Sequence, residues 1–148
     1  MKAGERIEPL RVRPDEDVTF RYAEASGDHS SVHLDEEFAR SVSLPGIILH
    51  GLYSMALVAR AANETASGDP RSLRSLAVQM HDIAVPGKEI EVTGTVAEVE
   101  GERALIDLEA QQEGRRIIRN ARAELDLSFA TRKKDESGHP GVERRPNG

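Results

Sequence analysis

The sequence contains no cysteine and no tryptophan, and aromatic residues make up only 3% of its 148 positions. Without cysteine the chain forms no disulfide, has no cysteine-ligated zinc and offers no thiol nucleophile, a composition that suits a reducing compartment. With so few aromatic residues, the core must be built from small aliphatic side chains. A thin core of this kind favours burial of further surface in an oligomer.

Long apolar runs and a surplus of positive charge are missing as well. The first ten residues, MKAGERIEPL, contain no apolar signal core, and no apolar run approaches the length that crosses a membrane. The formal net charge of −6 argues against a general nucleic-acid-binding protein, because phosphate contacts need a clustered basic surface. We therefore expect a cytoplasmic protein that binds neither membrane nor nucleic acid.

Several catalytic motifs do not occur in the chain. It has no G-x-G-x-x-G, no phosphate-binding G-x-x-x-x-G-K, no G-x-S-x-G and no H-E-x-x-H. The nearest approach to a metal site is His29 and His33, four residues apart, with Asp28 and Asp35 beside them. The neighbouring glycine and serines favour a loop over a helix at this place, and we predict no metal site.

The first half of the chain carries helical signals. Residues 6–13 read as a short edge strand, and helices are predicted in DEDVTFRYAEAS after Pro14 and in DEEFARSVS, where Asp35 is the predicted cap. From His50 to Ala66 only two residues are charged and apolar residues lie all round. This pattern predicts a long helix that is buried on every side.

The second half alternates apolar and polar residues, as strands do, in LRSLAVQMHDIAV, EIEVTGTVAEV, ALIDLEAQQ and IIRNARAELDLSF. Glu100-Gly101 and Glu113-Gly114 predict tight hairpins between the last three. We therefore predict an α+β fold in which an antiparallel meander wraps around one long helix. Residues 1–130 form the predicted domain, and the charged residues 131–148 are predicted to be a disordered tail.

Asp28 and His33 are the candidate catalytic pair. They lie five residues apart in the polar loop SGDHSSVH, between two predicted helices. A turn aspartate and a solvated histidine would explain the same residues. The chemistry that would use both is the addition or removal of water, in which a carboxylate holds and deprotonates a water while an imidazole handles the second proton near neutral pH.

His50 and Gly51 open the predicted long helix, and two interpretations remain open for them. Gly51 is small because the chain is crowded there, with His50 a hydrogen-bonded core histidine, or the two form part of a site. The first N–H groups of a helix have no acceptor within it, and a residue without Cβ lets a substrate carbonyl come close. Such an N–H would stabilise a developing negative charge.

YAEASGDHSSVH and IILHGL together resemble the signature of the MaoC-like, or type 2, enoyl-thioester hydratase and dehydratase family, and PGKEI resembles a turn common in it. The similarity covers about residues 6–128. It implies the hot-dog fold, a curved antiparallel sheet wrapped around a long central helix, usually as a dimer. Within the family, the chain resembles dehydratase subunits of actinobacterial type II fatty-acid synthesis, some of which pair with a second hot-dog subunit.

The resemblance implies catalysis by Asp28 and His33, a thioester-carbonyl contact from the Gly51 N–H, and weaker substrate contacts from His50 and Ser30. The implied reaction interconverts trans-2-enoyl and (R)-3-hydroxyacyl thioesters of coenzyme A or acyl carrier protein, with no metal or redox cofactor. The expected assembly is a homodimer or a heterodimer with another hot-dog subunit.

The chain departs from the family pattern at one informative place. Ser30-Ser31 stand where the family usually has Asn-Pro. This departure keeps a non-catalytic acyl-thioester-binding subunit as an alternative. A hot-dog thioesterase is the rival within enzymes, although such enzymes lack this pairing of motifs. The alanines of the long helix would leave room for a bulky acyl chain, or they reflect tight packing against the sheet.

Overall fold

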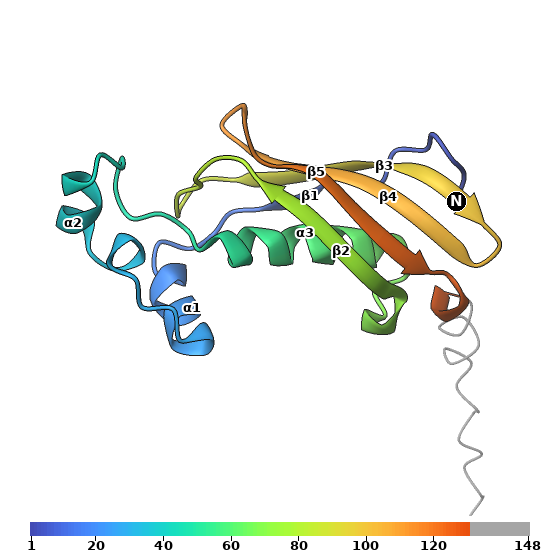
Figure 1. Ribbon diagram of the computed structural model, residues 1–148, viewed down its shortest axis with the longest axis horizontal. Coiled ribbons are helices and arrows are strands. Elements are labelled where there is room, and N and C mark those ends of the chain that lie inside the picture. Colours follow the sequence, from blue (N-terminus) through green and yellow to red (C-terminus); the bar gives the residue numbers. More distant parts are fainter. Residues whose placement is uncertain (131–148) are drawn as a thin grey trace, which may run out of the picture.

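The computed structural model describes residues 1–130, in which one long helix lies against a five-stranded antiparallel sheet (Figure 1). The helix is α3 (Gly51–Thr65). The strands are β1 (Leu10–Val12), β2 (Leu73–Met80), β3 (Ile90–Glu100), β4 (Arg103–Gln112) and β5 (Arg115–Asp126). The predicted α+β architecture, a sheet packed on one long helix, is confirmed.

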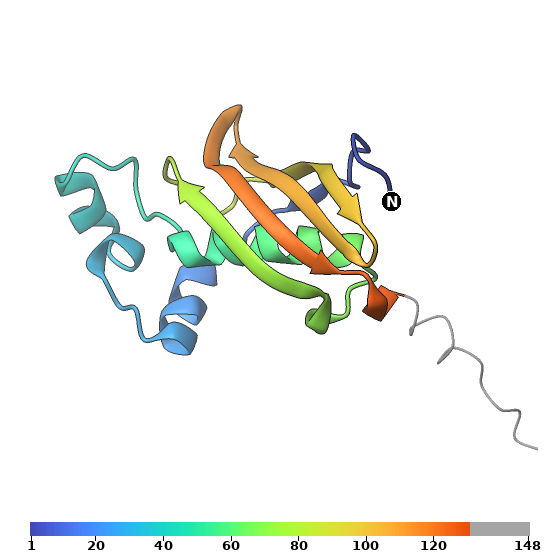
Figure 2. The same cartoon turned by 45° about the vertical axis from the view of Figure 1, so that its right-hand side comes forward.

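The two shorter helices, α1 (Val18–Ser26) and α2 (Glu36–Ser41), lie beyond the N-terminal end of α3 and away from the sheet (Figures 1 and 2). Between them is the 3-10 turn η1 (Ser31–His33), and a second such turn, η2 (Pro70–Ser72), precedes β2. The predicted cap of α2 is confirmed, because the Asp35 side chain accepts a hydrogen bond from the Phe38 N–H at 3.0 Å.

The order of strands in the sheet is β1-β3-β4-β5-β2. The predicted meander is therefore right for β3, β4 and β5 but wrong for β2. The hairpin between β4 and β5 turns at Glu113 and Gly114, whose φ angles of 51° and 76° suit a tight turn of two residues. β2 does not pair with β3, which follows it in sequence, but with β5 at the far edge of the sheet. Residues 81–89 connect β2 to β3, and this segment is too long to force the two strands to pair. Packing therefore decides which strand lies next to β2.

Burial of α3 differs from the prediction. The face that packs on the sheet carries Leu57, Val58, Ala61 and Ala62, all buried. The opposite side is open in the single chain, where Leu52 is 62% exposed. The prediction of burial on every side is therefore wrong for one chain, because the sheet covers only one face. Ala61 and Ala62 belong to the packed core, which favours tight packing over room for a bulky acyl chain.

The core consists of the small aliphatic side chains that the composition predicts. Its fully buried members include Ile90, Ile106, Ile118, Leu125 and Val58. No helix within residues 1–130 has the length and apolar character needed to cross a membrane. The predicted tail, residues 131–148, lies outside the described residues, and the domain boundary stays a prediction.

Candidate active site

The loop after α1 holds the carboxylate of Asp28 in a defined orientation. Gly27 ends the helix with φ 80°, and its N–H donates to the Ala23 carbonyl at 2.8 Å. Both the N–H and the hydroxyl of Ser30 donate to Asp28 Oδ1, at 3.1 and 2.7 Å. These two bonds, the hydroxyl first, hold the pKa of the Asp28 carboxyl below its ordinary value. The carboxyl is therefore ionised near neutral pH.

His33 lies at the end of η1, and its imidazole is almost completely buried, with the residue 9% exposed. Its Nδ1 lies 2.8 Å from the carbonyl oxygen of Ile48. Because a carbonyl can only accept, Nδ1 carries the proton and the neutral ring has its lone pair on Nε2. Ile48 is in turn fixed to η1, since its N–H donates to the Val32 carbonyl at 3.1 Å.

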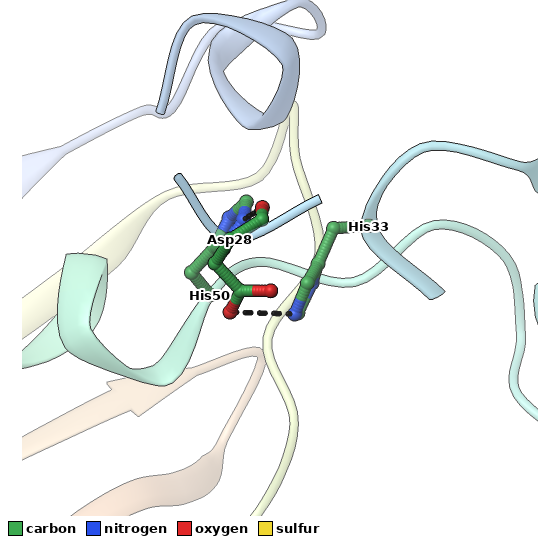
Figure 3. Close-up of side chains that lie close together, drawn as sticks. All are labelled: Asp28, His33 and His50. Carbon is green, nitrogen blue, oxygen red and sulfur yellow. Dashed lines mark hydrogen bonds and ion pairs between the residues drawn. The ribbon is translucent and has the colours of Figure 1, made fainter. Parts of the chain in front are cut away.

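Asp28 and His33 face each other through their remaining acceptor atoms. Asp28 Oδ2 and His33 Nε2 are 3.9 Å apart, and the carboxylate points toward the imidazole (Figure 3). This separation is too long for a direct hydrogen bond. A carboxylate oxygen and an unprotonated ring nitrogen at such a distance can both accept from one small donor placed between them, such as a water molecule.

His50 lies next to both members of the pair. It directly precedes α3, is 2% exposed, and its Nε2 is 3.0 Å from the backbone carbonyl of Asp28, to which it donates. Its ring stacks on that of His33, with centroids 3.8 Å apart and planes 20° from parallel. The ring of Tyr22 packs on it as well, at 4.6 Å. Among the described residues, His50 Nδ1 has no hydrogen-bond partner.

Gly51 and His33 border the same cavity, which has a volume of about 170 Å³. Gly51 is the first residue of α3, so its N–H has no acceptor within the helix. Ser54, one turn further along α3, also lines the cavity. The remaining lining is one charged residue, Asp82, and seven apolar ones: Ile48, Leu49, Met80, Ile83, Ala84, Ile117 and Ile118. A mainly apolar lining with a few polar groups is typical of small-molecule sites.

The structure places four of the five predicted site residues around the start of α3: Asp28, His33, His50 and Gly51. The fifth, Ser30, is hydrogen-bonded to Asp28. The Ser30 hydroxyl is directed to the Asp28 carboxylate. The side chain of His50 is buried outside the lining of the cavity. Their roles toward a substrate stay predictions.

The histidine considered for a metal site, His29, turns elsewhere. Its Nε2 lies 3.2 Å from a carboxylate oxygen of Glu24, and the contact raises the pKa of the His29 imidazole. A different trio, Asp28, His33 and His50, offers three ligand atoms within 4.8 Å of one another. A metal held through His50 Nε2 would displace the hydrogen bond of this atom to the Asp28 carbonyl.

Two contributors to the site escaped the sequence analysis. The Ile48 carbonyl sets the tautomer of His33, but a backbone group has no signature in the residue type. Tyr22 packs on His50, and its only sequence signal was its place in the family pattern. Ser54, the one hydroxyl near the start of the long helix on this side, was considered in the sequence but given no role, and it lines the cavity.

A curved antiparallel sheet packed on one long central helix is the hot-dog fold, which the solved structures below share. The chain belongs to the MaoC-like family, since the model of the MaoC like domain matches residues 3–115. The resemblance seen in the sequence is thereby confirmed.

The relatives that match in sequence include much longer proteins. The chain is 30% identical over 112 residues to the fatty acid synthase subunit beta of Saccharomyces cerevisiae, an alignment that covers 74% of this chain and 5% of that subunit. It is 26% identical over 109 residues to the peroxisomal enoyl-CoA hydratase 2 of Arabidopsis thaliana, covering 73% of this chain and 33% of the hydratase. The chain thus spans one twentieth and one third of these relatives.

Solved structures share the fold over most of the chain. A MaoC-like dehydratase superposes with a TM-score of 0.80 at 26% identity, covering 86% of this chain and 41% of that one. The (R)-hydratase from A. caviae involved in PHA biosynthesis gives 0.77 at 18%, covering 86% and 97%. The ChsH1-ChsH2 complex from Mycobacterium tuberculosis gives 0.74 at 19%, covering 84% and 96%.

Proposed function

We propose that this protein is a hydro-lyase that interconverts trans-2-enoyl and (R)-3-hydroxyacyl thioesters by addition or removal of water. The observation that carries the proposal is the pair of free acceptors, Asp28 Oδ2 and His33 Nε2, 3.9 Å apart at the edge of an apolar cavity. Membership of the MaoC-like family and the similarity to an enoyl-CoA hydratase support it.

In the hydration direction, one water donates a hydrogen bond to each acceptor. An imidazole is ordinarily a stronger base than a carboxylate, and the hydrogen bonds from Ser30 weaken Asp28 further as a base. His33 Nε2 therefore takes the proton from the water, while ionised Asp28 orients the water and stabilises the imidazolium. The water oxygen bonds to C3 of the enoyl group, and His33 returns the proton to C2.

Gly51 supplies the second half of the mechanism. As the bond to C3 forms, the electrons of the C2–C3 double bond move toward the thioester oxygen. An N–H at the start of α3 can donate to this oxygen, and the partial positive charge of a helix N-terminus adds to the stabilisation. When C2 takes up its proton, the electrons return and the thioester carbonyl is restored. Dehydration follows the same path in reverse.

The substrate handle is coenzyme A or the phosphopantetheine of acyl carrier protein, carried as part of the substrate. The proposed reaction moves only a water molecule and changes no oxidation state. It therefore requires no redox cofactor, and the two side chains together with the helix N–H provide the acid–base and electrostatic functions that a metal would otherwise serve.

We propose further that the working form is a dimer of hot-dog subunits, either two copies of this chain or one copy with a different subunit. β2 is at the edge of the sheet, so one side of its backbone is unpaired in the single chain. Leu52 and Met80, near the cavity, are exposed at 62% and 47%. The fold shared with the ChsH1-ChsH2 complex supports a two-subunit arrangement. The native mass of the protein, alone and co-expressed with a neighbouring hot-dog subunit, tests it.

One assay separates the proposed function from its rivals. Purified protein incubated with crotonyl-CoA should remove the ultraviolet absorbance of the enoyl thioester without releasing free thiol. Released thiol would identify a thioesterase. Unchanged substrate, in the single protein and in the co-expressed complex, would contradict the proposal and favour a non-catalytic binding subunit.

A further inference from the structure

We propose that His50 is a positioning residue for the reaction: it holds the backbone of Asp28 and the ring of His33 in one fixed relation and does not itself contact the substrate. This inference rests on the proposed function of the Asp28–His33 pair. His50 is 2% exposed and is not part of the cavity lining, so its ring acts through its neighbours.

The first link is the hydrogen bond from His50 Nε2 to the carbonyl of Asp28, at 3.0 Å. At the other end of the loop, Val32 and His33 are bonded to Ile48. Around Asp28 itself the other hydrogen bonds are local, since they join Gly27 to Ala23, Asp28 to Ser26 and Ser30 to Asp28. These local bonds shape the backbone at Asp28 but do not set its distance from α3. The bond from His50 spans 22 residues and ties the loop to the start of the central helix.

The second link is the stacking of the His50 ring on His33, with centroids 3.8 Å apart. The hydrogen bond of His33 Nδ1 to Ile48 fixes one point of that ring but allows it to tilt about this point. The face of a second ring removes this freedom.

The hydrogen bond from His50 to the Asp28 carbonyl fixes the tautomer of the ring. Because Nε2 donates to a carbonyl, the neutral ring carries its proton there, and Nδ1 keeps a lone pair. Within residues 1–130 this buried Nδ1 has no partner, which costs stability. The side chain does not cap α3 either. If this position served packing alone, an apolar ring would be more stable there. The buried donor of His50 therefore indicates a role in holding the site.

Two substitutions separate the two links. His50→Gln keeps a donor near the position of Nε2 but removes the ring, whereas His50→Phe keeps a ring and removes the donor. We expect His50→Gln to lower kcat roughly 10-fold and His50→Phe roughly 100-fold, both with KM little changed, because a small misplacement of the reacting groups is costly. His81→Gln, at an exposed histidine after β2, is the matched control and should retain full activity.

The discriminating measurement is a double-mutant cycle with Asp28→Asn. If His50 acts through the pair, His50→Phe should add little further loss in the Asp28→Asn background. Equal losses in both backgrounds, a loss confined to KM, or unchanged kcat in His50→Phe would each overturn the proposal. Melting curves of both His50 variants identify any unfolded sample, and the Gln variant keeps the test valid if the Phe variant does not fold. Wild-type hydration of crotonyl-CoA tests the proposed function separately.

Discussion

Oδ2 of Asp28 and Nε2 of His33 face each other across 3.9 Å. Each of these atoms remains available because the hydrogen bond that orients its side chain is made by the other polar atom of the same group. Oδ1 of Asp28 accepts from Ser30, and Nδ1 of His33 donates to Ile48. The carboxylate and the imidazole are thus orientated before any substrate binds. Two preorganised acceptors around one point are what the activation of a water molecule requires.

Removal of either acceptor should abolish most of the activity. We expect Asp28→Asn and His33→Ala each to lower kcat by roughly 10²–10⁴, since each removes a group that holds or takes a proton from the reacting water. Asp28 is half exposed, so Asp28→Asn should melt close to the wild type. Because both residues act on one water, the double variant should be little slower than the slower single variant. Near-normal hydration by either single variant would rule out the assigned chemistry.

Ser30→Ala should change the pH dependence of the reaction. The hydroxyl of Ser30 is the largest of the influences that lower the pKa of Asp28, and the backbone N–H remains in the variant. Loss of the hydroxyl should therefore raise the pKa of the carboxyl toward its ordinary value. Ionised Asp28 and unprotonated His33 are both needed, so the acidic limb of the kcat/KM profile has two steps, and the carboxyl gives the lower one. This lower step should move to higher pH.

The same argument gives the sign for stability. A carboxyl whose pKa is lowered by folding contributes stability above its unfolded pKa, and this contribution is lost as the pH falls through the folded value. Ser30→Ala should therefore be less stable than the wild type near neutral pH, where Asp28 is ionised. In strong acid, where the carboxyl is protonated in both proteins, the two should melt alike. Ser31→Ala, at an exposed neighbour, is the control. An unchanged lower step of the acidic limb in Ser30→Ala would show that Ser30 does not tune the carboxyl.

Gly51→Ala separates rate from stability. A Cβ at Gly51 would meet the side chain of Met80 at 3.5 and 3.6 Å, which is ordinary contact, and alanine suits a helical position better than glycine. The melting temperature should therefore hold or rise. The methyl group would hinder approach of the thioester oxygen to the N–H, and we expect kcat to fall by roughly 10²–10³. Full activity would exclude the N–H as a carbonyl donor; loss of stability along with rate would point to crowding alone.

Gln112→Leu should destabilise the fold. The side chain of Gln112 is 1% exposed and makes three hydrogen bonds to a neighbouring loop: it accepts from the Val85 N–H at 2.9 Å and donates to the carbonyls of Val85 and Lys88 at 2.8 and 3.0 Å. Leucine would leave these backbone groups unpaired. We expect a loss of about 3 kcal/mol, read from chemical denaturation.

The control for this prediction is the neighbouring residue on β4. Gln111 is only half buried and makes one side-chain hydrogen bond, to Glu91 at 3.0 Å. Gln111→Leu should therefore change the free energy of unfolding by less than about 1 kcal/mol. The loop that Gln112 holds leads from the cavity residues Ile83 and Ala84, so Gln112→Leu should also lower activity. Equal stability of the two variants would contradict the assigned role of Gln112.

Much of the fold could be predicted from the sequence, because its signals are local. Asp35 caps α2 as its residue type predicts, Gly27 ends α1, and the hairpin at Glu113-Gly114 connects β4 and β5. Each depends on backbone angles or hydrogen bonds within a few residues. The candidate pair was suggested by the short loop that contains both Asp28 and His33, and its role was implied by the resemblance to the MaoC-like family.

What the sequence could not determine depends on contacts between distant residues. The place of β2 beside β5 follows from packing across the sheet, and the exposure of Leu52 follows from a sheet that covers only one face of α3. Within the site, the decisive partners are the carbonyls of Ile48 and Asp28. Every residue carries a carbonyl, so the sequence alone could not show which ones orient His33 and His50; only the fold, by bringing the loop to the start of the helix, selects them.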